Sequence, residues 1–245
     1  MACLPLLAPA ADADADALVR AAQAAEARLD SLGALRLLEQ ADAARPNDAS
    51  ILQRIARQYS DLVVEQPDDD ARRRFAQRAL DYAQRAATLQ PDDPVNVLSL
   101  AICHGKLALY SDTSAKIRYS RLVKAEAERA LALDPGYAWA HHVLGRWHHE
   151  VAALGSTSRF LVRVLYGGLP DASFAAAMRH LRQAAELEPG ELNHWLELGF
   201  AQMAAGFPAE AEASWRRGLA MPSRAKHDAA AKERAQSALS KLSPR

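Results

Sequence analysis

The sequence predicts an all-α fold, a solenoid of about five helical hairpins closed by a C-terminal capping helix. The first observation is composition: 54 of the 245 residues are Ala and 33 are Leu, whereas Val, Ile and Thr together number 17. Ala and Leu favour helices, while strands draw on β-branched and aromatic side chains. The second observation is an internal repeat, because five amphipathic segments end alike at a proline. A β-sandwich, a barrel or a parallel sheet is hard to build from this composition.

The repeated unit is a pair of helices, and its second helix ends where a proline cannot continue it. These prolines are Pro46, Pro91, Pro135, Pro189 and Pro222. If the proline is position 32 of a unit of about 34 residues, a small residue occupies position 27 in each unit. These are Ala41, Ala86, Ala130, Ala184 and Gly218. Position 20 is small in four units, with Ala34, Ala79, Ala177 and Ala211. Small side chains at these positions let the two helices of a unit approach closely.

The first helices of the units repeat as well, at positions 4, 7, 8 and 11. The second unit has Leu52, Ile55, Ala56 and Tyr59, the fourth His141, Leu144, Gly145 and His148, and the fifth Trp195, Leu198, Gly199 and Gln202. This pattern resembles the tetratricopeptide repeat, in which large residues pack around small ones between two antiparallel helices. One hairpin cannot bury its apolar face alone, so the resemblance implies a stack of hairpins from about Ala15 to Leu242.

We expect a single solenoid domain over residues 15–242, preceded by residues 1–14 as a flexible or residual signal-like segment. Residues 3–10 are typical of the apolar part of a secretion signal, and small residues at 8–13 suit a cleavage site. No Lys or Arg precedes that stretch. The sequence therefore favours a cytoplasmic protein, with an exported or periplasmic one as the alternative if the signal is truncated. No apolar run of 18 residues predicts a transmembrane helix.

Extra residues separate the two helices of the second, third and fourth units. We expect them to form connections at residues 63–74, 110–120 and 155–173. The longest contains an insert, residues 156–169, whose apolar residues recur at helical spacing: Phe160, Leu161, Val164 and Leu165. We expect a helix of about two turns, ended by Gly167-Gly168. So short a helix needs a buried apolar face, against the solenoid's own groove, a ligand or a membrane. We expect Trp147 to pack under this insert.

The fourth unit resembles the regulator of microtubule dynamics family. The matching residues are Leu144, Gly145, Arg146, Trp147, Glu150, Val151 and Ala152. As in the family, an extra helix, a Gly-Pro turn and an Ala-rich helix ending in Pro-Gly follow, and residues 114–135 are similar too. The resemblance implies a tetratricopeptide-like fold and a binding or tethering module on microtubules or organelle membranes. Composition and spacing by themselves indicate no such partner.

No residue pattern predicts catalysis, a cofactor or a metal, so we expect a protein that is not an enzyme. Thirty Lys plus Arg balance 30 Asp plus Glu, which disfavours nucleic acid as a partner. One cluster contains four histidines, His141, His142, His148 and His149, followed by Glu150. Its pairs are seven residues apart, about 10 Å along a helix, which is too far for one zinc ion. We interpret His141 and His148, which occupy packing positions 4 and 11 of the repeat, as contacts between helices.

Repeat geometry predicts a groove, because positions 2, 5, 9, 12 and 13 of the first helices line the concave surface of such a solenoid. In the fourth unit these residues are Trp139, His142, Arg146, His149 and Glu150, and other units contribute Arg57, Lys106, Asn193, Leu196, Phe200 and Met203. The groove changes from cationic to apolar along its length, which suits a peptide with an acidic end and hydrophobic side chains, or an anionic amphiphile. Phe200 and Met203 have an alternative role, packing against a C-terminal helix at 225–242.

Two functions fit this arrangement. We expect a non-catalytic scaffold that binds a protein partner in the groove. The alternative is a carrier or tether for a lipid or another apolar ligand, which uses the groove together with the insert 156–169. In it Phe160, Leu161, Val164 and Leu165 form a lid. A closed apolar cavity under the insert would favour the carrier, and an open groove of mixed polarity would favour the scaffold.

Overall fold

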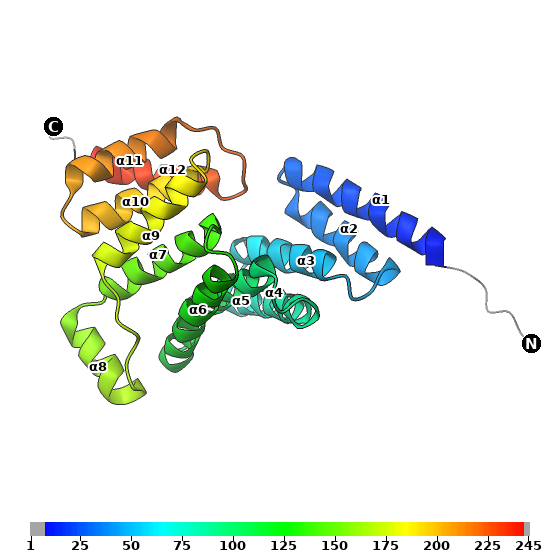
Figure 1. Cartoon of the computed structure of the whole chain (residues 1–245), viewed down its shortest axis with the longest axis horizontal. Coiled ribbons are helices and arrows are strands. Elements are labelled where there is room, and N and C mark those ends of the chain that lie inside the picture. The colour runs from blue at the N-terminus through cyan, green and yellow to red at the C-terminus, as the bar shows by residue number, and fades with distance from the viewer. Residues whose placement is uncertain (1–7, 243–245) are drawn as a thin grey trace, which may run out of the picture. The chain divides into compact units, whose positions relative to one another are not determined.

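The computed structural model describes residues 8–242, which form twelve α-helices and one 3-10 turn (Figure 1). In chain order the helices are α1 (Ala8–Ala27), α2 (Ser31–Ala44), α3 (Ala49–Leu62), α4 (Asp69–Leu89), α5 (Pro94–Leu109), α6 (Thr113–Leu133), α7 (Ala138–Ala152), α8 (Ser156–Tyr166), α9 (Phe174–Leu187), α10 (Leu192–Ala204), α11 (Pro208–Ala220) and α12 (Asp228–Ser240). The predicted all-α class is confirmed, and no helix between residues 8 and 242 is both long and apolar enough to cross a bilayer.

The helices group into two compact structural units, each larger than one repeated hairpin. The first structural unit ends at Tyr110 and the second begins at Ser111. The first unit holds the pairs α1/α2 and α3/α4, followed by α5, and the second holds α6, the pairs α7/α9 and α10/α11, and α12. The single domain over residues 15–242 stays a prediction. Its expected start falls within α1, and residues 1–7 of the signal-like segment lie outside the described residues.

Small residues lie where the paired helices touch, as the repeat predicts. In the helix pairs α1/α2, α3/α4, α7/α9 and α10/α11, the alanines at positions 20 and 27 are fully buried, namely Ala34, Ala41, Ala79, Ala86, Ala177, Ala184 and Ala211. Ala130 of α6 is fully buried as well. Gly145 of α7 shows how close the approach is. A Cβ atom there would lie 2.5 Å from Cγ of Leu181 and 3.2 Å from the backbone oxygen of Ala177, both on α9. Such distances confirm the repeat register of the fourth unit.

The extra residues of the second and third repeated hairpins lengthen helices and do not form long connections. The expectation of long connections there was wrong. Helices α4 and α6 have 21 residues each and include residues 69–74 and 113–120. Aspartate caps start both helices early: Asp68 accepts a hydrogen bond from the Ala71 N–H at 2.7 Å, and Asp112 accepts one from the Ala115 N–H at 2.9 Å. These caps satisfy backbone donors that a helix start would leave unpaired.

The insert of the fourth repeated hairpin is a separate helix, α8. Its 11 residues make about three turns, where two were expected. It ends at Gly167-Gly168 as predicted. Gly167 has a φ of 74°, and the N–H groups of Gly167 and Gly168 donate to the carbonyls of Arg163 and Val162, each at 3.1 Å. A left-handed residue paired in this way is a common helix ending, and glycine adopts it without strain.

Candidate functional site

The predicted groove residues of the fourth and fifth repeated hairpins lie on two neighbouring helices, α7 and α10. Their contact is a histidine pair, with Nδ1 of His142 2.9 Å from Nδ1 of His194 and the Trp139 ring packed against both imidazoles. His142 is 6% exposed and His194 is fully buried. Burial lowers the pKa of His142 well below its usual value and that of His194 to about 4. At pH 7 both rings are therefore neutral, and one Nδ1–H donates to the other ring.

A second histidine group joins α7 to α9. Nδ1 of His141 lies 3.0 Å from Nδ1 of His180, and the His148 ring stacks on His180 with 5.7 Å between ring centroids. Burial, with the nearby His141 and His148, lowers the pKa of His180 to about 4. The predicted contacts between helices are thus found for His141 and His148, whereas His142, predicted to line the groove, is buried against His194. Among the described side chains, no group of three or more His, Cys, Asp or Glu is placed to hold a metal ion.

On α7, charged residues form the accessible part of the predicted groove. Nη2 of Arg146 donates to Oε1 of Glu150 at 2.9 Å, and the side chains of the two residues are 44% and 64% exposed. Nε of Arg146 also lies 3.9 Å from Oε1 of Glu197, a nearly buried residue of α10 that accepts a hydrogen bond from Arg234 of α12. His149, half-buried on the same helix, packs against the ring of Phe174, the first residue of α9. This face of α7 therefore offers both charge signs beside aromatic rings.

The apolar end of the predicted groove is covered by α12. Leu196 is buried, and Phe200 and Met203 pack in one cluster with Trp215 of α11 and Ala235 of α12. The alternative role for Phe200 and Met203, packing against the C-terminal helix, is thus observed.

Asn193, also predicted to line the groove, holds the start of α12. Its Nδ2 donates to Oδ1 of Asp228 at 2.9 Å, and that buried carboxylate also accepts from the backbone N–H groups of Arg224 and Ala225. Asp228 is a residue that sequence reasoning missed, because its partner Asn193 is 35 residues away.

Two predicted groove residues belong to the first unit. Arg57 of α3 is exposed, and its Nε lies 4.0 Å from a carboxylate oxygen of Asp61 one helical turn away. Lys106 lies in the last turn of α5 and is half-buried. The structure thus places Arg57 and Lys106 in a different unit from the groove residues of α7 and α10.

The insert helix α8 turns its apolar face to solvent. The exposed fractions are 65% for Phe160, 50% for Leu161, 63% for Val164 and 65% for Leu165. Burial of this face against the solenoid, one of the expected outcomes, is wrong. The reason is that Val162 and Tyr166, both half-buried, form the side of α8 that faces the protein.

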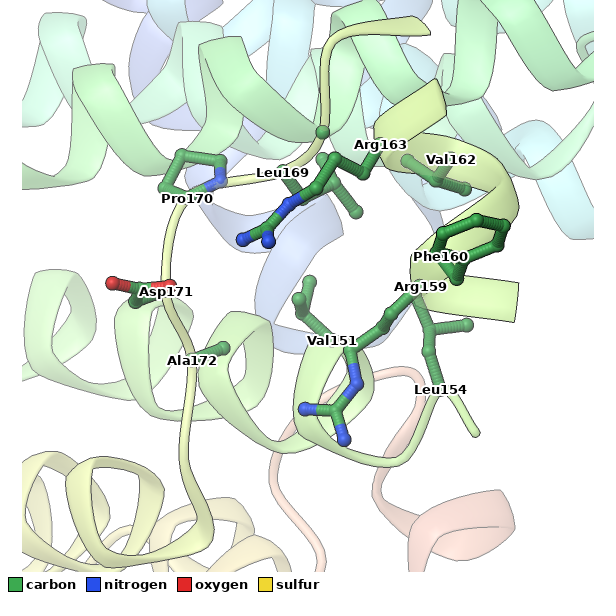
Figure 2. Close-up of a pocket in the computed structure, with 11 residues that line it drawn as sticks. Val151, Leu154, Arg159, Phe160, Val162, Arg163, Leu169, Pro170, Asp171 and Ala172 are labelled. Atoms are coloured by element: carbon green, nitrogen blue, oxygen red, sulfur yellow. The ribbon is translucent and has the colours of Figure 1, made fainter. Parts of the chain in front are cut away.

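Beneath α8 lies a pocket of about 340 Å³ (Figure 2). Apolar side chains from the end of α7, from α8 and from the following segment line it, together with Arg159, Arg163 and Asp171. In Figure 2 the guanidinium groups of Arg159 and Arg163 extend from α8 into the space beside residues 170–172. This mixed lining differs from the closed apolar cavity that a lipid carrier would be expected to have.

The segment after α8 is fixed to the body of the second unit at two points. Arg121 of α6 donates to the carbonyl oxygens of Tyr166 and Gly168. These two residues lie 45 and 47 positions after Arg121 in the chain. Trp147 packs under Leu169 and Ala172, and its Nε1–H donates to the Ser120 carbonyl at 2.8 Å. The expected position of Trp147 under the insert is confirmed for the segment that follows α8. No local sequence pattern indicates the role of Arg121.

Comparisons with known proteins agree with this architecture. A solved tetratricopeptide-repeat protein from Thermus thermophilus superposes with a TM-score of 0.67 at 21% identity, over 92% of this chain and 98% of that one, which shows the fold. Regulator of microtubule dynamics protein 3 of Xenopus laevis is 31% identical over 139 residues, 57% of this chain and 30% of that protein. Regulator of microtubule dynamics protein 1 of Mus musculus is 27% identical over 143 residues, 58% of this chain and 47% of that protein.

The aligned regions thus cover less than half of the length of either relative. The profile of the family described as regulator of microtubule dynamics protein 1-3 matches residues 13–243, nearly the whole chain. That match includes the histidine-rich helix α7, the insert helix α8 and the capping helix α12. The chain therefore belongs to the regulator of microtubule dynamics protein 1-3 family.

Proposed function

We propose that this chain is a non-catalytic interaction module that binds a segment of a protein partner along the exposed face of α7. The observation that carries the proposal is the row of Trp139, Arg146, His149 and Glu150 on one side of α7, accessible or half-buried. On the same side His142 is buried against His194 of α10, and on another side of α7 His141 contacts His180 of α9, so the helix is held in place. A rigid helix that presents an aromatic ring and an arginine is typical of an interaction hot spot.

The charges of this face suggest how a partner would bind. Arg146 is held by Glu150, an exposed residue on the same helix, and by the more distant Glu197. A carboxylate of a partner would displace Glu150 and form a charge-assisted pair with the arginine fork. The ring of Trp139 would then pack against an apolar side chain of the same peptide. The proposal retains the predicted acidic end of the partner and places it at Arg146.

The alternative function, a carrier or tether for a lipid or another apolar ligand, has weaker support. The pocket under α8 would have to enclose the ligand, and three charged side chains line it: Arg159, Arg163 and Asp171. Covering an acyl chain there would bury these charges without evident partners, which is unfavourable. The names of the relatives refer to microtubules, and for this chain microtubules are one candidate among protein partners.

The experiment compares affinity capture by three forms of the full chain: wild type, Arg146→Gln and the control Arg216→Gln. Arg216 suits the control because it forms an exposed i,i+4 pair with Glu212 at 2.5 Å, on a helix away from the proposed face. Proteins captured by wild type and Arg216→Gln but depleted at least about fivefold with Arg146→Gln would support the proposal.

Equal capture by all three forms would contradict the proposal. Native mass spectrometry of the wild-type protein tests the alternative in the same preparation. A stoichiometric lipid bound to the chain, retained in Arg146→Gln, would support the carrier.

A further inference from the structure

The apolar face of α8 is a large exposed hydrophobic feature on a short helix. Four side chains, Phe160, Leu161, Val164 and Leu165, lie on one side of three helical turns and are each at least half exposed. Within the second unit α8 stands off the end of the α7/α9 pair, and its C-terminal end is the part that Arg121 of α6 holds (Figure 1). The face therefore protrudes, and within the described part of the second unit no apolar surface covers it.

The charge around this face is cationic. The sequence of α8, residues 156–166, contains Arg159 and Arg163 and no Asp or Glu. Both arginines are exposed and extend on the pocket side of the helix. The adjoining helix α6 has an exposed Lys116, Arg118 and Arg121 in its first turns, with no acidic residue from 113 to 125. Two carboxylates lie near this surface. Asp171 lines the pocket behind α8, and Asp112 is engaged as the cap of α6.

The size of the face argues against a protein as its occupant. An 11-residue helix is about 17 Å long, and its apolar side covers on the order of 200 Å². A stable interface between proteins, including two copies of this chain, buries about 800 Å² on each partner. A bilayer surface sets no such minimum, because apolar side chains insert singly among the lipids while cations stay at the headgroups.

We propose that α8 docks the second unit onto an anionic membrane surface. Phe160, Leu161, Val164 and Leu165 enter the boundary between headgroups and acyl chains. The long side chains of Arg159 and Arg163 leave the pocket side of α8 and reach lipid phosphates or carboxylates. The contact is reversible, because a single short helix buries little apolar area. It uses a different surface from the peptide-binding face of α7, so the two proposals can fail separately.

The test is flotation of the full chain with vesicles of about 100 nm, made either of phosphatidylcholine alone or with about 30 mol% phosphatidylserine. We expect wild type to bind the anionic vesicles, and to bind more weakly at about 0.5 M than at about 0.05 M salt. The double variant Phe160→Ser/Leu165→Ser should partition at least about tenfold more weakly. Arg159→Gln/Arg163→Gln should bind the anionic vesicles about fivefold more weakly for each arginine removed, at low salt.

Matched controls come from elsewhere in the chain. Leu109→Ser removes a leucine that is 63% exposed on α5, and Arg216→Gln removes an exposed arginine of α11. Both should bind anionic vesicles like wild type, as should Arg146→Gln. Circular dichroism should show the same helix content and Tm for all variants, because none of the substituted α8 side chains lies in the core.

A second readout does not depend on the serine variants. In a Cys3→Ser background, where the remaining Cys103 is buried, an environment-sensitive dye at Leu161→Cys should shift to the blue with anionic vesicles. The proposal is overturned if wild type fails to float with anionic vesicles or binds neutral ones equally well. It is also overturned if the α8 variants bind like wild type, or if they change only the sedimentation of the chain, which would assign α8 to self-association.

Discussion

Gly145 lies at the closest approach of α7 and α9, where no side chain fits. A Cβ atom would lie 2.5 Å from Leu181 and 3.2 Å from a backbone oxygen that cannot move aside easily. We expect Gly145→Ala to lower the free energy of unfolding by about 1–3 kcal/mol through overpacking. Urea denaturation measures the loss. The control is Gly190→Ala, since a Cβ atom there meets nothing within 4 Å. Equal stability of the two variants would contradict the repeat register.

The buried histidine pair makes stability depend on pH. The pKa of His194 falls from 6.5 to about 4 on burial, so the unfolded chain binds more protons between these values. The free energy of unfolding should therefore fall as pH drops from 6.5 to about 4, by on the order of 2–3 kcal/mol for this residue. Glu188, whose carboxylate lies 3.5 Å from His194 Nε2, offsets part of the loss by pairing with the charged ring.

The measurement is urea denaturation of wild type and His194→Asn at several values of pH from about 4.5 to about 7, the range in which the buried and the unfolded histidine differ in charge. The variant should be less stable at pH 7, because it loses packing, and should show a smaller dependence on pH. An identical pH dependence in both proteins would show that the pair does not titrate as described.

At the scale of the element, α8 and the segment after it have separate roles. Trp147 is 5% exposed and packs under Leu169, whereas Phe160 faces solvent. We expect Leu169→Ser to shift the emission of Trp147 to the red and to lower stability by about 1–3 kcal/mol. Phe160→Ser should change neither, although it lies in the same insert. The contribution of Trp147 is isolated by repeating both substitutions with Trp147→Phe, and a red shift that persists there would come from another tryptophan.

At the scale of the whole molecule, charge balance limits which polymers the chain can bind. Thirty basic and 30 acidic residues give a formal net charge of zero. Long-range attraction to an acidic surface is therefore weak at about 0.15 M salt. We expect no sub-micromolar co-sedimentation with polymerised microtubules and no comparable binding to duplex DNA under these conditions. Such binding would mean that a local patch, such as the basic first turns of α6, overrides the balance.

The sequence by itself determined the all-α class, the repeat register and the family. Composition and helical spacing are local properties, so they identify the hairpins and the small residues between them, such as Gly145 and Ala184. The end of α8 at Gly167-Gly168 followed in the same way, because a left-handed cap needs glycine. The length of α4 and α6 did not, since the capping aspartates Asp68 and Asp112 were assigned to loops.

The tertiary structure alone decided which predicted site residues are accessible. His142 and Phe200 occupy groove positions of the repeat, but His142 pairs with His194, 52 residues away, and Phe200 packs in the cluster that α12 completes. The sequence pattern of α8 shows an apolar face and leaves open what it contacts. Only the fold shows that Arg121 holds the end of α8 while Phe160 stays in solvent. Contacts between residues far apart in the chain depend on how helices stack, and helical periodicity does not encode them.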